Sequence, residues 1–391
     1  MQSFYKNRFK RVGEISFYIL LVVCFFTNIS QIPYFVENGI TQYLSQPLWG
    51  FLFLWIVLSF DWVFSKEFIY LFTYYAFLAL CAVFMDIFFQ GEYLLSSIFI
   101  NVTISILIFF VGCFFSGIDR QRIDLLLKGY VYSSFVVSCF VFFGYFWGKV
   151  DLQSSAYAYA SKNSISLIIL TAIIIIFHFH SCERNGNPVN LNLMKIMGIF
   201  LVIVLSVLRS RAVILALIII CFYFIGRFFI LEKMTKRKAL LVVCLVAASS
   251  FCFFIYSDFI FYKILLAGRN ADSLNDISSG RVDIIMSFPD LINDKYMTGI
   301  GDIYFECYPL SVFLNFGIPF GTFVLILSCI PLWLVKGIKK KNSYYGLFMM
   351  IIFSYYTNSL FEGLAPVGPG AKCYFLWLLA GILYKNKSVE Q

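Results

Sequence analysis

Long apolar runs alternate with short polar stretches along most of the chain. A helix needs about 20 apolar residues to cross the hydrocarbon layer, and against that length the runs predict about twelve transmembrane helices. The predicted spans cover residues 14–33, 46–64, 68–88, 94–115, 125–147, 163–180, 196–208, 212–231, 239–257, 309–335, 343–361 and 372–385. We therefore predict an all-α integral membrane protein, organised as one polytopic domain over residues 1–391.

Composition agrees with a membrane location. Of the 391 residues, 61% are hydrophobic and 13% are charged, whereas a soluble domain carries roughly a quarter charged residues. The basic start, from Lys6 to Arg11, leads into an apolar run without a small-residue cleavage site, which predicts a retained signal anchor. Most of the eleven cysteines sit inside apolar runs, and no Cys-X-X-Cys pair occurs. The sequence therefore predicts neither a disulfide framework nor a metal site.

The basic residues indicate how the spans are oriented. With a cytoplasmic N-terminus, most Lys and Arg residues fall in the predicted inside segments, including the clusters KMTKRK (233–238) and KGIKKK (336–341). This is the bias that the positive-inside rule describes. We read the net charge of +9 as a topology signal and expect no nucleic-acid partner, with both termini in the cytoplasm.

One predicted external segment, residues 258–308, is far longer than the others. Long loops in compact proteins are usually functional or disordered, and this one holds enough Ile, Leu, Phe and Tyr to fold against the membrane with short helices. It also concentrates acids: Asp258, Asp272, Asp276, Asp283, Asp290, Asp294, Asp302 and Glu306. We expect the working face of the protein to be the external one.

Four arginines fall on that external side, against the charge bias: Arg209, Arg211, Arg269 and Arg281. Two of them form the tight hairpin VLRSRAVIL. Such side chains either snorkel into the lipid phosphate layer or form an anion site, because the guanidinium fork binds phosphate oxygens in pairs. Arg281 follows Gly280 at the start of a short helix predicted from Ser279. A bound anion would suit that helix start, and the alternative is a surface ion pair with Asp283 or Asp276.

An ordered set of motifs resembles a known family. Ser210–Arg211 opens a helix, Gly280–Arg281 follows in the external loop, and GIG (Gly299 to Gly301) precedes FGIPFG (Phe316 to Gly321). Over residues 200–335 this order resembles the O-antigen ligase/polymerase superfamily, which contains the Wzy-type polymerases and their ligase relatives. An arginine-to-glycine spacing described in some polymerases matches Arg269 to Gly280.

The resemblance implies a GT-C-like glycosyltransferase that uses undecaprenyl-pyrophosphate-linked glycans and needs no cofactor or metal. It implies a bacterial inner-membrane protein of lipopolysaccharide biosynthesis, active on the periplasmic face among membrane lipids, with a chain-length regulator protein as a further partner. Ligases of the superfamily carry a histidine just before the Gly-Ile helix. Here that stretch reads DIYFECYPLSVFLNFG, and the two histidines, His178 and His180, lie at the opposite end of a span. A polymerase is therefore favoured over a ligase.

A flippase or secondary transporter is the alternative of another class. Those proteins place ionisable residues at mid-membrane and often show two similar halves. Here the mid-span positions are almost free of charge and no internal repeat is seen, so the enzyme is favoured.

The mechanism that follows assigns roles to named residues. Arg209, Arg211 and Arg281, with Arg269 as a further contributor, are predicted to hold the pyrophosphate, and Arg211 and Arg281 are counted as catalytic because they stabilise the leaving group. Glu306 and Asp302 are the candidates for a general base, and Asp283 is third. Tyr304 and Tyr308 are candidates for contact with sugar rings. For each acid the alternative is a solvated loop residue or an arginine partner.

Overall fold

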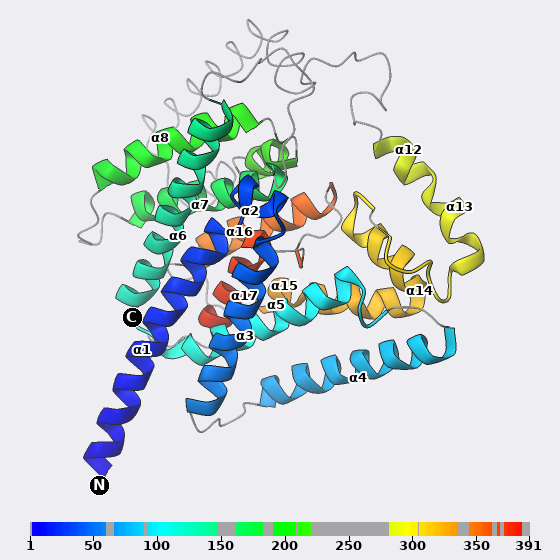
Figure 1. The fold of residues 1–391 in the computed structure, drawn as a ribbon, viewed down its shortest axis with the longest axis horizontal. Coiled ribbons are helices and arrows are strands. Elements are labelled where there is room, and N and C mark those ends of the chain that lie inside the picture. The colour runs from blue at the N-terminus through cyan, green and yellow to red at the C-terminus, as the bar shows by residue number, and fades with distance from the viewer. Residues whose placement is uncertain are drawn as a thin grey trace, which may run out of the picture.

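The computed structural model describes residues 2–59, 66–89, 93–146, 162–182, 191–208, 210, 212–220, 281–303, 305–334, 344–361, 366–367 and 371–384. Within these ranges the regular elements are helices and no strand occurs. Their order is shown in Figure 1. The bounds of the longer helices are α1 Gln2–Ile29, α3 Thr41–Ser59, α4 Lys66–Phe89, α5 Ser97–Phe114, α6 Arg120–Val141, α7 Lys162–Cys182, α8 Leu191–Leu208, α14 Tyr308–Ser328, α16 Tyr345–Ser359 and α17 Ala371–Leu383.

The shorter elements lie mostly in connections. They are α2 Pro33–Glu37, the 3₁₀ turn η1 Phe115–Gly117, the π-helical turn η2 Phe142–Phe146, α12 Arg281–Met286, α13 Phe288–Ile292, the 3₁₀ turn η5 Asn293–Lys295 and α15 Ile330–Leu334. The short helices α12 and α13 agree with the prediction that the external loop folds into helical pieces.

Apolar helices of membrane-spanning character recur along the described chain. Judged by length and composition alone, five could cross a membrane: 69–88, 97–117, 120–144, 162–180 and 308–328, the last of which is interrupted at Gly317. Four shorter apolar helices cover 13–29, 43–59, 192–208 and 373–383. Each of these overlaps a predicted span, which confirms the expectation of an all-α integral membrane protein. The predicted span at 239–257 lies outside the described residues.

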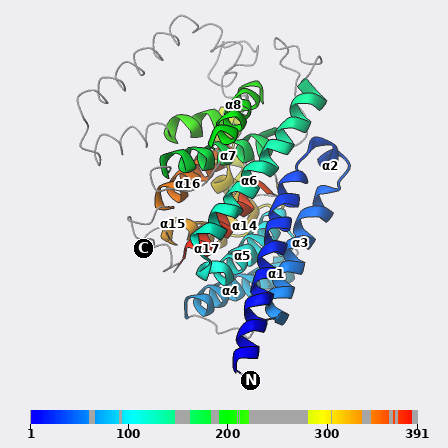
Figure 2. The same cartoon turned by 90° about the vertical axis from the view of Figure 1, so that its left-hand side faces the viewer.

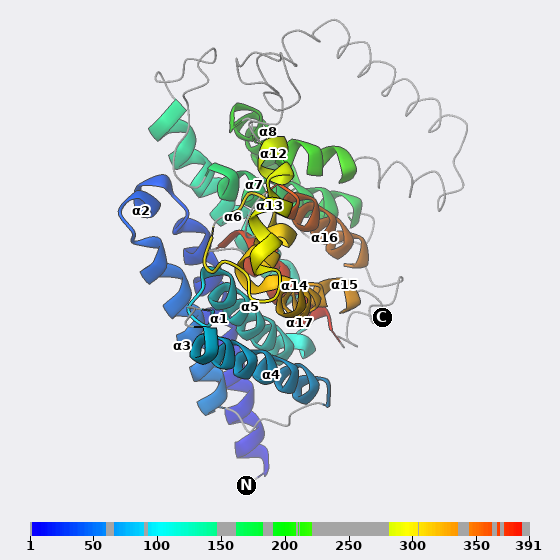
Figure 3. The same ribbon diagram turned by 90° about the vertical axis from the view of Figure 1, so that its right-hand side faces the viewer.

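The centre of the bundle is the crossing of α5 and α17. A Cβ atom on Gly112 would collide with the carbonyl oxygen of Leu378, and one on Gly381 would collide with that of Phe109. Two glycines therefore let the helix backbones touch, which is how membrane helices gain packing without a hydrophobic driving force. The views in Figures 2 and 3 place α5 and α17 among the other helices.

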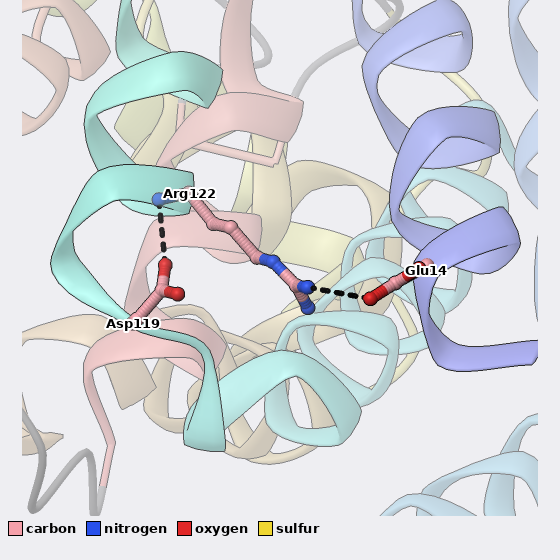
Figure 4. Close-up of polar contacts among 3 residues, drawn as sticks. All are labelled: Glu14, Asp119 and Arg122. Carbon is pink, nitrogen blue, oxygen red and sulfur yellow. Dashed lines mark hydrogen bonds and ion pairs between the residues drawn. The ribbon is translucent and has the colours of Figure 1, made fainter. Parts of the chain in front are cut away.

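Side chains tie several helices together at one end of the bundle. The α6 N-cap Asp119 accepts a bond from the Arg122 backbone N–H at 2.9 Å, and the Arg122 guanidinium lies 3.6 Å from a Glu14 carboxylate oxygen on α1 (Figure 4). Further along α6, the Asp124 carboxylate accepts a hydrogen bond from the Tyr344 hydroxyl at 2.6 Å. The Tyr344 ring lies 5.2 Å from the ring of His178. The starts of α6 and α16 and the end of α7 thus share one end, as the predicted alternation of spans requires.

Candidate active site

The first feature of the site is a reversal inside α14. Gly317 has φ 72° and ψ 169°, which is not helical, and it divides α14 into Tyr308–Phe316 and Ile318–Ser328. The Tyr308 and Ser328 hydroxyls, twenty residues apart, lie 2.5 Å apart, and a Cβ on Gly321 would lie 3.0 Å from the Phe313 ring. The two halves therefore fold back on one another as a helical hairpin with Gly317 at its tip.

This hairpin differs from the single straight span predicted for 309–335. The physical reason is a glycine at positive φ, which is open to glycine and strained for other residues, followed by Pro319 within the first turn of the second half, where proline is tolerated. An apolar run of sufficient length cannot reveal such a reversal. Each half alone is too short to cross a bilayer, which takes about 20 residues.

The GIG motif contacts the tip of the hairpin through its backbone. The Ile300 N–H donates to the Leu314 carbonyl at 2.6 Å, and the Ile318 N–H donates to the Tyr296 carbonyl at 2.7 Å. Gly299 (φ 73°) comes so close that its Cβ would lie 2.6 Å from the Gly317 nitrogen, and a Cβ on Gly317 would collide with the Met297 carbonyl. The two glycine motifs that carry the family resemblance are thus in direct backbone contact.

The chain between Ile303 and Tyr308 runs along the hairpin. Near the hairpin tip, the Asn315 side chain donates to the Ile303 carbonyl at 3.0 Å. At the end of the hairpin far from the tip, the Tyr308 hydroxyl is hydrogen-bonded to the Ser328 hydroxyl. Phe305 and Cys307 are buried against Ile292 and Leu314. Glu306, half-buried, lies between them. Glu306 is thus a half-buried carboxylate in the segment that packs on the hairpin.

Asp302 holds this unit against α5. One carboxylate oxygen accepts from the Ser97 hydroxyl at 2.7 Å and the other from the Ser97 backbone N–H at 3.3 Å. Ser97 is the first residue of α5, after the N-cap Ser96. A carboxylate there satisfies a free N–H and suits the helix dipole. Both oxygens of Asp302 are therefore engaged with a helix end, and its role as a base stays a prediction.

The turn between α4 and α5 supplies further support that sequence reasoning missed. Asp86 accepts from the backbone N–H groups of Tyr93 and Leu94, and the Tyr93 ring lies 6.3 Å from that of Phe316 near the hairpin tip. Burial raises the pKa of the Tyr93 hydroxyl, its bond to Thr298 opposes this, and the Asp86 charge adds to it. The sequence did offer one signal for this turn: Asp86 lies in the last turn of a predicted span and has no basic residue near it in the sequence.

Of the four arginines predicted to bind the anion, only Arg281 lies among the described residues, and only its backbone is described. Arg209, Arg211, Arg269 and Tyr304 lie outside the described residues. Ser210, between the first two arginines, is buried and donates to the Asn163 side chain at 3.2 Å, so the end of α8 and the start of α7 meet there. The predicted short helix is confirmed from Arg281, with Asp283 exposed in its first turn.

One predicted sugar contact needs correction. Tyr308 is only 2% exposed and its hydroxyl is bonded to Ser328. A ring enclosed in this way has no face to offer a sugar, so Tyr308 is a packing residue of the hairpin. Among the described residues, no group of three His, Cys, Asp or Glu side chains is placed to hold a metal.

Comparison with known proteins supports the same region. Residues 196–322 match the family model described as O-Antigen ligase, about a third of the chain. Among curated proteins, none matches the chain. The match supports a place in the O-antigen ligase/polymerase superfamily, whose members are glycosyltransferase-like enzymes acting on lipid-linked glycans, without separating a polymerase from a ligase. Both glycine motifs begin inside the matched region.

Proposed function

We propose that this protein polymerises undecaprenyl-pyrophosphate-linked repeat units into O-antigen or a related surface polysaccharide on the periplasmic face of the bacterial inner membrane. The observation that carries the proposal is the backbone contact of GIG with the FGIPFG hairpin, inside a region matched by the O-antigen ligase family. That unit holds a carboxylate, Glu306, and no histidine.

The position of the histidines favours the polymerase. The chain has two, His178 and His180. His178 is buried beside Tyr344, near the start of α6. The hairpin unit instead contacts the first residue of α5, Ser97, at the end of α5 that is far from the start of α6. A ligase with its histidine at the candidate site is therefore not supported.

In the proposed reaction, Arg209, Arg211 and Arg281, with Arg269, hold the pyrophosphate of the donor lipid. The terminal hydroxyl of a second repeat unit attacks the anomeric carbon, the bond to pyrophosphate breaks, and its electron pair leaves with the phosphate oxygen. Fixed guanidinium groups stabilise the charge as it develops. Inversion follows from the single displacement, and Glu306 takes the hydroxyl proton. Asp302 positions the loop through Ser97, and Tyr304 contacts the sugar.

A ligase is the second candidate, because the matching family model is described as O-Antigen ligase. A deletion strain separates the two on a lipopolysaccharide gel. Loss of the ladder with one repeat unit retained on the lipid A core supports a polymerase. Loss of every repeat unit supports a ligase, and cytoplasmic accumulation of lipid-linked units supports a flippase. Restoration of the ladder by the wild-type chain is the control.

A further inference from the structure

The hairpin tip carries apolar side chains that are exposed in the described part of the structure. Five side chains flank the tip and are exposed to similar degrees: Tyr296 55%, Met297 57%, Ile300 38%, Ile303 38% and Ile318 45%. We call this set the tip ridge. It is held in place by hydrogen bonds: the Tyr296 carbonyl accepts from the Ile318 N–H, the Ile300 N–H donates to the Leu314 carbonyl, and the Ile303 carbonyl accepts from the Asn315 side chain. The ridge is thus a built surface of the folded unit.

The ridge continues the surface that faces lipid. Below Ile318, the second half of α14 exposes Phe323, whose ring lies 6.3 Å from Phe77 of α4 and whose carbonyl accepts from the Tyr74 hydroxyl at 3.0 Å. α4 itself exposes large apolar side chains along its length: Ile69, Tyr70, Phe72, Phe77, Leu80, Val83, Phe84, Ile87 and Phe88. In an integral membrane protein such a helix face contacts acyl chains.

The ridge also lies level with the end of that span. Phe316, next to the hairpin tip, lies with its ring 6.3 Å from that of Tyr93, and the Tyr93 backbone N–H donates to Asp86 in the last turn of α4. The end of an apolar span marks the boundary of the hydrocarbon layer, where tyrosine is enriched. Tyr296, exposed on the ridge, fits that position.

We propose that the tip ridge inserts into the outer-leaflet interface and binds bilayer lipid through apolar contact. The segment 281–303 holds four acids (Asp283, Asp290, Asp294 and Asp302) against two basic residues (Arg281 and Lys295). A net negative segment gains nothing from anionic headgroups, so the apolar surface carries the contact. This inference goes beyond the proposed enzymatic function and does not depend on it.

Photo-crosslinking of the full chain tests the proposal. A benzophenone amino acid replaces Met297 or Ile303 on the ridge, or Asp290 or Asp294 as matched controls, which are exposed residues of the same segment. The variants are placed in nanodiscs of phosphatidylcholine alone, which contain no polyprenyl lipid. The expected result is several-fold more phosphatidylcholine adduct from the ridge positions than from the controls, measured by mass spectrometry.

Changing the nanodisc composition and identifying the crosslinked molecule make the outcome decisive. Adding anionic lipid or salt should leave the adduct yield unchanged. Equal yields from ridge and control positions, or adducts to a second copy of the chain in place of lipid, would overturn the proposal. Adducts that appear only after a polyprenyl phosphate is added would also overturn it, because they would assign the ridge to the substrate tail. None of these readouts requires catalytic activity, so a failed enzyme assay leaves the test intact.

Discussion

Gly299 and Gly317 meet backbone to backbone, so closely that a Cβ on Gly299 would lie 2.6 Å from the Gly317 nitrogen. Both also have positive φ, at 73° and 72°. An L side chain at either position would face two costs, the left-handed conformation and the collision with backbone. This contact joins the GIG loop to the α14 hairpin, and through Asp302 to α5.

A graded series of glycine substitutions separates those two costs. Gly299→Ala and Gly317→Ala should destabilise the protein most, because strain of about 1–2 kcal/mol adds to the collision. Gly301→Ala should give the strain alone, since Gly301 has φ 106° and no atom within 4 Å of an added Cβ. Gly50→Ala, in α3 and equally uncrowded, should be neutral or stabilising. Thermal unfolding in detergent provides the ranking, and equal midpoints for Gly299→Ala and Gly50→Ala would contradict it.

The two acids of the hairpin unit should behave differently. Glu306→Gln removes the proposed base and should lower the rate of polymerisation by about 10²–10⁴-fold, with thermal stability unchanged. Asp302→Asn keeps an oxygen for the Ser97 hydroxyl and should cost only a few-fold. The assay is turnover of purified lipid-linked repeat units.

Ser97 supplies the control for Asp302. If Asp302 acts by holding the loop on α5, Ser97→Ala should reproduce part of the Asp302→Ala defect, and the double variant should be no worse than Asp302→Ala, because contacting residues are not additive. A catalytic role for Asp302 would instead appear as a large loss in Asp302→Asn with Ser97→Ala silent.

The arginines predicted to lie on the external side are expected to control the length of the glycan seen on a gel. Arg211→Ala or Arg281→Ala should abolish the long glycan and leave one repeat unit on the lipid A core, since the departing pyrophosphate loses a fixed charge. Arg→Lys should be partly tolerated, because lysine cannot make the bidentate contact. Arg122→Ala is the matched control: it removes an arginine paired with Glu14 at the opposite end of the bundle. A full ladder from either Arg211→Ala or Arg281→Ala would remove that residue from the site.

The sequence predicted the elements of the fold better than their contacts. Span length identified α4 to α7 because the hydrocarbon thickness sets a local rule, and the short helix predicted from Ser279 is observed as α12 from Arg281. The hairpin escaped prediction because its cause is the backbone conformation of one residue, Gly317, inside a run that is mostly apolar. The bonds from Asp302 to Ser97 join residues 205 positions apart, and no local pattern encodes such a pairing. The enclosure of Tyr308 was missed for the same reason, since Ser328 reaches it only after the reversal.

The opposite end of the bundle offers a test of stability that leaves the site untouched. Tyr344 is buried and its hydroxyl donates to the buried Asp124 carboxylate at 2.6 Å. Tyr344→Phe removes that donor while keeping the ring beside His178, and a hydrogen bond to a charged group is worth about 1.5–3 kcal/mol. Tyr345→Phe alters the adjacent, half-buried tyrosine and should have little effect. We therefore expect a clear fall in the unfolding midpoint for Tyr344→Phe alone, with the polysaccharide ladder of the remaining folded protein unchanged. Equal midpoints for the two variants would show that the Asp124 contact adds nothing to the assembly of α6 and α16.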